Sequence, residues 1–339
     1  MRFSTSAFAP ACTSPNHGEA DPLRLYPDAS GGEAAVTRYR VFPGMELDYR
    51  DVHARACREL RDGSGERLEI HHCLKGRVEY RQNGRYFYLS PGDLAVARTS
   101  SLPPDSRFPT GHYHGITVTI DPAAAPECLS CILSDVEVRP ATLMEKLCPG
   151  GTVFTARSSR RVKHVFSELY AVPEDIRKGY LKVKLLELLL FLSTLSPEDG
   201  QTPHGCTAAQ VSLAEQVKAC LLAEPDRTLT LKSLSQQFNV SEAQIKSSFT
   251  GVYGMSPAAY ARSQRMHGAA ALLRETDRTV LDIACQFGYD NASKFARAFR
   301  DVIGVSPREY RAGAEYDSCA PQLGEKPVSL SDADAERRI

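Results

Sequence analysis

Residues 283–300 read IACQFGYDNASKFARAFR, and this stretch decides the fold of the C-terminal part of the chain. An apolar segment runs into Gly288, and three residues later a second helical segment begins that carries three Lys or Arg side chains. Glycine adopts the left-handed backbone that commonly ends a helix, and Asn291 is a residue type that caps the start of one. The pattern therefore predicts two short helices joined by a tight turn, with a basic second helix.

The same unit occurs a second time in the chain. Residues 254–260 read GMSPAAY, and residues 304–310 read GVSPREY, fifty positions later. Upstream, TLKSLSQQF (230–238) corresponds to TVLDIACQF (279–287), and Asn239 takes the turn position of Gly288. Two helices joined by a short turn form a helix-turn-helix unit, whose second helix can lie in the major groove of DNA. The repeat predicts two such units at a fixed spacing. Two copies are a far more specific signal than a single helix-turn-helix pattern.

These motifs carry a family resemblance. Residues 283–311 resemble the signature region of the AraC/XylS family of transcription regulators, and residues 210–312 resemble that family's DNA-binding domain. The resemblance implies an α+β multidomain fold. Its N-terminal part would be a cupin-like antiparallel β-barrel with dimerisation helices. Its C-terminal part would be an all-α domain with two helix-turn-helix units that binds a double-stranded DNA operator in a sequence-specific manner.

The resemblance also implies which side chains meet DNA. The base-facing positions of the first unit fall at Ala243, Lys246 and Ser247, and those of the second at Ala292, Ser293 and Arg297. The adjoining Lys294 is expected to be a phosphate contact or a plain surface charge. Arginine can make a bidentate contact with guanine, so Arg297 is the foremost candidate; the alternative is a phosphate contact or a solvated position. Ser247 departs from the Arg that many members carry, so the first unit is expected to read its half-site weakly.

The N-terminal half has a β pattern. Between residues 36 and 155 the segments are short and separated by turn residues, most clearly in VEYRQNGRYFYLSPGDLAVA (78–97). Asn83-Gly84 between two alternating segments is a strong hairpin signal. Several short strands with regular turns predict an antiparallel barrel or sandwich. EIHHCLKGRVEYRQNGRYFYLSPGDLAVA resembles the sensor barrel that members of the family commonly carry.

Candidate effector-binding residues lie in this half. We expect side chains from the following set to line the barrel: His72, Tyr80, Tyr88, His112 and His114. His71 and His72 are adjacent and therefore point to opposite faces of a strand, which argues against a shared metal site. We expect no metal and no cofactor. Ordinary packing of these residues is the alternative, and the Cys128-x-x-Cys131 pair is a weak redox or metal signal.

A leucine-rich helix is predicted at residues 180–195, YLKVKLLELLLFLSTL. Its leucines recur at intervals of four and three residues, which is the spacing of a coiled-coil seam; they are Leu181, Leu185, Leu188, Leu192 and Leu195. We expect this seam to form a homodimer interface. The alternative is a helix buried within its own domain.

Composition bounds the organisation of the chain. Lys+Arg equals Asp+Glu at 41 each in 339 residues, yet residues 226–313 contain 12 basic against 8 acidic residues. The predicted parts are a disordered segment (1–35), a cupin-like sensor and dimerisation domain (36–196), a linker (197–209), the DNA-binding domain (210–312) and a disordered tail (313–339). The N-terminus lacks a signal-peptide pattern, and no apolar run is long enough to span a bilayer, so we expect a cytoplasmic protein.

The sequence thus indicates a transcription regulator, interpreted as an activator, that is controlled by a small-molecule effector. A contact with RNA polymerase is compatible with this role, and no membrane partner is expected. The alternative is a redox- or metal-responsive regulator on the same scaffold, which would use the scattered cysteines and histidines. No nucleophile, base or carboxylate constellation argues for an enzyme.

Overall fold

A computed structural model describes residues 21–24, 26–27, 31–58, 65–125, 138–200, 205–223 and 230–313. The chain divides into two compact units. One comprises residues up to Ala214 together with Ser247–Gly254, and the other comprises Glu215–Lys246 and the residues from Met255 onward. The expected disordered tail and the Cys128/Cys131 pair lie outside the described residues.

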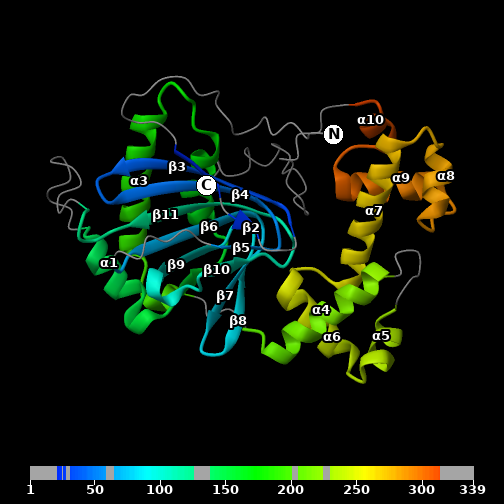
Figure 1. Cartoon of the computed structure of the whole chain (residues 1–339), viewed down its shortest axis with the longest axis horizontal. Coiled ribbons are helices and arrows are strands. Elements are labelled where there is room, and N and C mark those ends of the chain that lie inside the picture. Colours follow the sequence, from blue (N-terminus) through cyan, green and yellow to red (C-terminus); the bar gives the residue numbers. More distant parts are fainter. Residues whose placement is uncertain are drawn as a thin grey trace, which may run out of the picture. The chain divides into compact units, whose positions relative to one another are not determined.

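The first unit is built on a seven-stranded antiparallel sheet in the order β1-β3-β4-β11-β6-β9-β12 (Figure 1). Its strands are β1 (Asp21–Arg24), β3 (Glu33–Phe42), β4 (Met45–His53), β11 (Tyr113–Ile120), β6 (Leu68–Gly76), β9 (Leu94–Arg98) and β12 (Phe154–Ala156). A smaller sheet contains β10 (Asp105–Arg107), β5 (Ala56–Arg58) and β2 (Tyr26–Pro27), and β7 (Val78–Gln82) pairs with β8 (Arg85–Leu89). The predicted antiparallel architecture is confirmed. None of these sheets closes on itself within the described residues, so the predicted closed barrel is not confirmed.

Local turn chemistry explains the β7–β8 hairpin. Asn83 and Gly84 both have positive φ, at 50° and 72°, as a two-residue turn between right-twisted strands requires. The N-terminal segment differs from the expectation of disorder over residues 1–35, because β1, β2 and the start of β3 fall within it. Asp21–Arg24 lacks a periodic pattern of its own; it is ordered by pairing its backbone with Ala35–Arg38 at the sheet edge.

One face of the large sheet is covered by helices. These are α1 (Pro140–Leu147), α2 (Arg160–Ser167) and α3 (Arg177–Thr194), with short 3-10 turns at Thr99–Ser101, Pro149–Gly151, Glu168–Ala171 and Pro197–Asp199. Alternate strand residues such as Ile70 and Val118 pack against these helices in one continuous core. The residues between them, including His71 and Thr117, point to the opposite face.

The leucine seam of α3 is not an exposed interface. Leu181, Leu185, Leu188 and Leu192 are at most 2% exposed and belong to the core beneath the sheet. The expectation that this seam joins two chains is therefore wrong, and the alternative of a helix buried in its own domain holds. Leucine spacing identifies an apolar helix face, but it does not distinguish a partner helix from a sheet as the surface that covers that face.

The C-terminal part is entirely helical in the residues that the structure describes. Its helices are α4 (Ala208–Ala223), α5 (Leu231–Phe238), α6 (Glu242–Tyr253), α7 (Pro257–Glu275), α8 (Val280–Gln286), α9 (Ala292–Ile303) and α10 (Pro307–Arg311). Phe295, Phe299 and Ile303 of α9 pack against Leu273 of α7 and Ile283 of α8 in a compact core. The helices predicted by the repeat are thus present at both positions.

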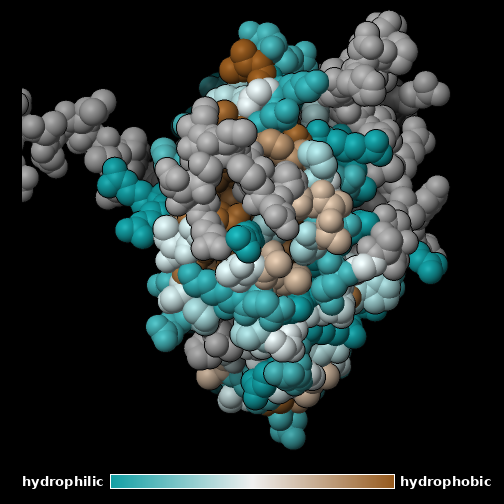
Figure 2. Space-filling model, turned by 90° about the vertical axis from the view of Figure 1, so that its left-hand side faces the viewer, coloured by the Kyte–Doolittle hydropathy of each residue, from teal (hydrophilic) through white to brown (hydrophobic). Residues whose placement is uncertain are grey.

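Hydrophilic residues predominate on the face of the molecule that Figure 2 draws. Figure 2 shows one face on which hydrophobic residues appear in small separate groups in the part that is not drawn in grey. None of the described helices combines the length and the apolar character that crossing a bilayer would require.

Candidate nucleic-acid interface and ligand cavity

The turn between α8 and α9 is determined by two residues. Gly288 has φ of +78°, and the backbone N–H of Tyr289 donates to the carbonyl oxygen of Ala284 at 2.9 Å, which ends α8. Asn291 then caps α9, because its side-chain oxygen accepts hydrogen bonds from the N–H groups of Ser293 (2.8 Å) and Lys294 (3.3 Å). The direction of α9 is therefore set at its first turn.

The two sides of α9 differ sharply. Phe295 and Phe299 are fully buried, and their rings lie 5.7 Å apart against the core. The exposed side carries all of the predicted DNA-binding positions of this helix: Ala292, Ser293, Lys294 and Arg297. Arg300 is exposed as well, so α9 presents three cations, and cations near phosphate oxygens supply most non-specific DNA affinity.

Helices α5 and α6 repeat this arrangement with other residue types. Asn239 takes the left-handed turn with φ of +51°, and the Ser241 hydroxyl accepts a hydrogen bond from the N–H of Gln244 at 3.2 Å. Ile245 and Phe249 are fully buried. The predicted contact positions on α6 are all exposed; they are Ala243, Lys246 and Ser247. This helix carries one cation where α9 carries three.

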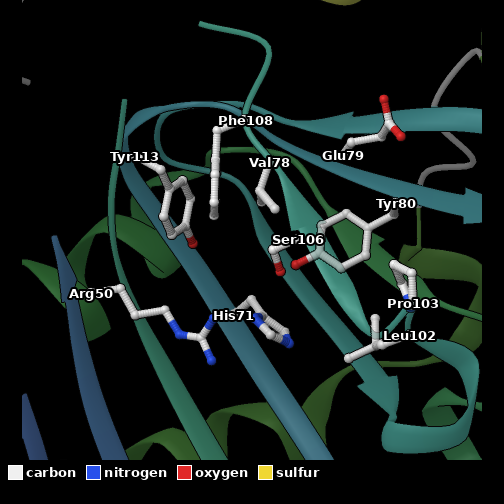
Figure 3. A pocket seen from close by; sticks show the side chains of 10 residues that line it. All are labelled: Arg50, His71, Val78, Glu79, Tyr80, Leu102, Pro103, Ser106, Phe108 and Tyr113. Carbon is white, nitrogen blue, oxygen red and sulfur yellow. The ribbon is translucent and has the colours of Figure 1, made fainter. Parts of the chain in front are cut away.

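A cavity lies on the sheet face opposite helices α1–α3 (Figure 3). The empty space between its lining residues, counted together with the adjoining open solvent, is about 330 Å³, so the cavity itself is small. Its lining includes two cationic or titratable side chains and several aromatic ones: Arg50, His71, Tyr80, Phe108 and Tyr113. The rings of Phe108 and Tyr113 are stacked at 5.2 Å, and those of His71 and Tyr80 meet edge to face at 5.8 Å. Concave apolar sites with a few polar groups are typical of small-molecule binding.

Of the predicted effector residues, the cavity includes Tyr80. His72 lies on the opposite face, stacked on Phe166 at 4.1 Å with its Nδ1 2.9 Å from the Tyr170 hydroxyl oxygen, and burial lowers its pKa to about 4. Tyr88 is buried elsewhere and donates a hydrogen bond to Glu79.

The other two predicted histidines also lie away from the cavity lining. His112 is exposed, and His114 lies beside Asp51 and His53 on the face of β4 and β11 that is turned away from the cavity. Arg50, Phe108 and Tyr113 were not predicted, because strand register across distant segments brings them together.

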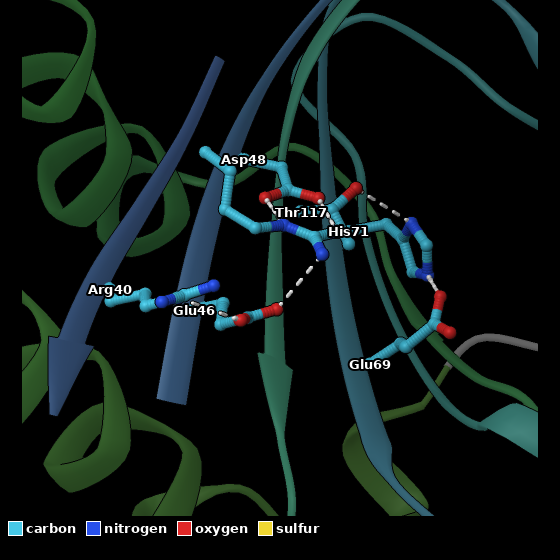
Figure 4. Close-up of polar contacts among 7 residues, drawn as sticks. Arg40, Glu46, Asp48, Glu69, His71 and Thr117 are labelled. Carbon is cyan, nitrogen blue, oxygen red and sulfur yellow. Dashed lines mark hydrogen bonds and ion pairs between the residues drawn. The ribbon is translucent and has the colours of Figure 1, made fainter. Parts of the chain in front are cut away.

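Hydrogen bonds and ion pairs join polar side chains of neighbouring strands in the large sheet (Figure 4). Thr117 lies with its hydroxyl 3.2 Å from His71 Nδ1, and Glu69 lies 3.1 Å from His71 Nε2. On the neighbouring strands, Arg38 donates two 2.8 Å hydrogen bonds to the buried carboxylate of Asp48. A buried charge of this kind is tolerable only when it is paired, and Arg38 provides that pairing for Asp48.

Three of the described cysteines, Cys73, Cys148 and Cys206, do not have the character of redox switches. Burial raises the pKa of the Cys73 and Cys206 thiols, and it raises the pKa of Cys148 to about 11. The thiolate is the reactive form, so these three thiols are poorly reactive at neutral pH. Cys285 is exposed, on α8.

Comparison with known proteins identifies the class of the C-terminal helical domain. The helix-turn-helix domain family matches residues 234–313, so the C-terminal part belongs to the helix-turn-helix class of DNA-binding domains. A putative AraC-like transcription regulator of Streptomyces lividans is 30% identical over 130 residues, which span 37% of this chain and 43% of that protein. The chain belongs to the AraC/XylS family of transcription regulators.

A longer match extends into the first unit. The arabinose operon regulatory protein of Salmonella typhimurium is 24% identical over 259 residues, covering 71% of this chain and 82% of that protein. A solved probable AraC family regulator from Rhodopseudomonas palustris is 31% identical and covers 30% of this chain and 97% of its own, with a TM-score of 0.29. The relatives from Streptomyces lividans and Salmonella typhimurium are named as regulators, in agreement with the expectation that the chain is not an enzyme.

Proposed function

We propose that the chain is a sequence-specific DNA-binding activator of transcription that a small-molecule effector controls. It would work in the cytoplasm as a homodimer that contacts an operator and RNA polymerase. The observation that carries the proposal is the repeated helix pair with an exposed polar face on each second helix, α6 and α9. In this proposal each pair is a helix-turn-helix unit.

The parts of the chain would divide this work. The DNA-binding domain would comprise residues 210–312, joined by the linker at 197–209 to a cupin-like sensor domain that ends near residue 196. Lys246 on α6 and Arg297 on α9 would read base edges, while Lys294 and Arg300 would contact phosphates. The short side chains of Ala243 and Ala292 suit apolar contact with thymine methyl groups.

The cavity supports effector control of this site. Arg50 offers a guanidinium to an anionic group, and the stacked rings of Phe108 and Tyr113 offer an apolar wall. A compact ligand that carries a carboxylate on an apolar body would suit the Arg50 guanidinium and the aromatic rings of this lining. Of the effector residues predicted from sequence, Tyr80 keeps this role in the proposal, joined by His71.

Selection of bound DNA from a random pool by the full chain tests the proposal. We expect one bipartite motif to be enriched, and we expect small aromatic or aliphatic carboxylates to change the enrichment. Failure to enrich any motif would contradict DNA reading. Enrichment that no carboxylate alters, combined with unchanged ligand binding in Arg50→Ala, would contradict the effector assignment alone.

A further inference from the structure

Three potential metal ligands meet on the face of the large sheet that is turned away from the cavity. Asp51 and His53 are two residues apart on β4 and therefore point to the same face. His114 on β11 lies directly opposite Asp51 in the strand register. The β-sheet pairing, which is long-range in sequence, thus gathers two imidazoles and a carboxylate at one place.

The distances between the ligand atoms suit a shared ion. His53 Nε2 and His114 Nδ1 lie 3.0 Å and 3.2 Å from the same Asp51 oxygen, Oδ1, and one ligand atom from each of the three residues lies within 4.8 Å of the others. Ligand atoms bonded at about 2.0 Å to one tetrahedral zinc ion are about 3.3 Å apart. Two of the three separations therefore already match, and the His53 side chain, 58% exposed, has room to close the third.

The surroundings give the cluster a net negative bias. Glu33 lies opposite His53 in the register of β3 and β4, and Asp51 carries the second acidic charge. Lys75 lies opposite His114 on β6 and opposes this bias with one positive charge. Two carboxylates against one ammonium favour a bound cation, and the partial exposure of the cluster leaves room for water as a further ligand.

We propose that Asp51, His53 and His114 form a binding site for a divalent transition metal of the zinc type. Two imidazoles and one carboxylate are a donor set that such ions accept, with positions left open for water. Without an ion, the same three residues would form a hydrogen-bonded His–Asp–His cluster only, and that is the outcome against which the proposal is tested.

The site would link the strands that line the cavity. Asp51 is adjacent to Arg50, and His114 is adjacent to Tyr113, whose side chains lie on the cavity side of the same two strands. An ion held by both strands would tie β4 to β11 at the level of these residues. The metal site does not depend on the proposed effector, because its ligands lie on the other face of the sheet.

Metal binding is measured on the full chain after dialysis against a chelator. Zn²⁺ is titrated in competition with a chromophoric chelator, and Co²⁺ is added separately to record its absorption spectrum. We expect one tight site per chain and a Co²⁺ spectrum with weak visible bands and no intense near-ultraviolet thiolate band. His114→Ala and Asp51→Asn should each weaken Zn²⁺ binding at least about tenfold, since even outer-shell partners of metal ligands are worth ~10–100-fold.

Two variants keep this test decisive. His53→Ala removes a largely exposed side chain, so it should leave the fold intact while weakening Zn²⁺ binding to the same extent. His164→Ala is the matched control, because His164 is an exposed histidine 3.8 Å from Glu187 that belongs to no three-ligand cluster in the described part of the chain. The proposal is overturned if no tight site appears, if Co²⁺ shows a thiolate band, or if His164→Ala weakens binding as much as His53→Ala.

Discussion

Arg297 lies one helical turn after Ser293 on the exposed side of α9, while Phe295 and Phe299 anchor the other side. We expect Arg297→Ala to weaken operator binding by about 1–3 kcal/mol and to relax the preference at one base pair. The reason is the loss of a bidentate contact that the short side chains of Ala292 and Ser293 cannot replace. Gel-shift titration against the selected operator and its single-base variants measures both effects.

A charge-matched control separates base reading from general attraction. Arg308→Ala removes one exposed cation from α10, outside the helix pair, and should weaken all sequences slightly and equally. If Arg297→Ala behaves in the same way as Arg308→Ala, Arg297 contacts phosphate or solvent and the assignment fails.

His72 gives a prediction about pH. Burial lowers its pKa to about 4 in the folded chain, against about 6.5 for an unfolded histidine. The unfolded state therefore binds the proton first, so the contribution of His72 to stability is present above about pH 6.5 and is lost as the pH falls towards 4. Chemical denaturation at several pH values should show this loss, on the order of 2–3 kcal/mol, as part of the total decline.

His72→Gln isolates the contribution of this residue. The amide can still meet the Tyr170 hydroxyl, but it does not titrate. The free energy of unfolding of the variant should decline less than that of the parent between pH 6.5 and 4. Parallel pH profiles for the two proteins would show that the buried imidazole is not the source of the loss.

At the scale of single elements, the start of α9 depends on its cap. Asn291→Ala removes the acceptor for two backbone N–H groups and should lower the free energy of unfolding by about 1 kcal/mol. It should also weaken operator binding, because Ser293 and Lys294 lie in the first turn that the cap orders. Asn291→Asp keeps a good capping side chain and should restore most of the stability; a destabilisation equal to that of the alanine variant would count against the cap.

Substitutions in helix α3 test whether its leucine seam packs within its own domain or forms a dimer interface. Leu185 is 1% exposed within the core, so Leu185→Ala should lower the free energy of unfolding by about 2–5 kcal/mol. Val183→Ala on the same helix, at 63% exposure, should change it by less than about 0.5 kcal/mol. Denaturant titration combined with sedimentation gives both readouts. If Leu185→Ala is as stable as the parent protein but sediments as a monomer where the parent sediments as a dimer, the seam is a dimer interface after all.

These elements show what could be predicted from sequence. Gly288, Asn291 and Asn83-Gly84 act through their own backbone geometry, so short-range signals identified the turns and the cap correctly. The apolar face of α3 was also recognised, but the surface that covers it was not. That choice depends on the tertiary arrangement of the sheet, which helical periodicity does not contain.

The binding residues of the first unit were mostly beyond prediction for the same reason. Arg50 and Tyr113 are 63 positions apart in the chain and meet through the register of β4 and β11. The His53–His114 pair arises from that register as well. By contrast, the exposed positions of α9 follow from a repeat and a family resemblance, and their exposure agrees with the expected role.

At the scale of the whole molecule, the spacing of the two helix pairs limits which operators fit. Helix α7 connects them and has 19 residues, which corresponds to about 28 Å of continuous helix. Successive major grooves on one face of DNA are about 34 Å apart. In the proposed function, one chain therefore reads two neighbouring half-sites through a connection that cannot lengthen by a further DNA turn.

Insertions into the selected operator test this geometry. Five added base pairs between the half-sites rotate one of them to the opposite face of the DNA, and ten added base pairs restore the face but add about 34 Å. A helical connection tolerates neither change, so both insertions should reduce the affinity of the full chain to that of a single half-site. If ten base pairs restore binding while five do not, the half-sites are read by separate chains of a dimer, and the assignment of both helix pairs of one chain to adjacent grooves is wrong.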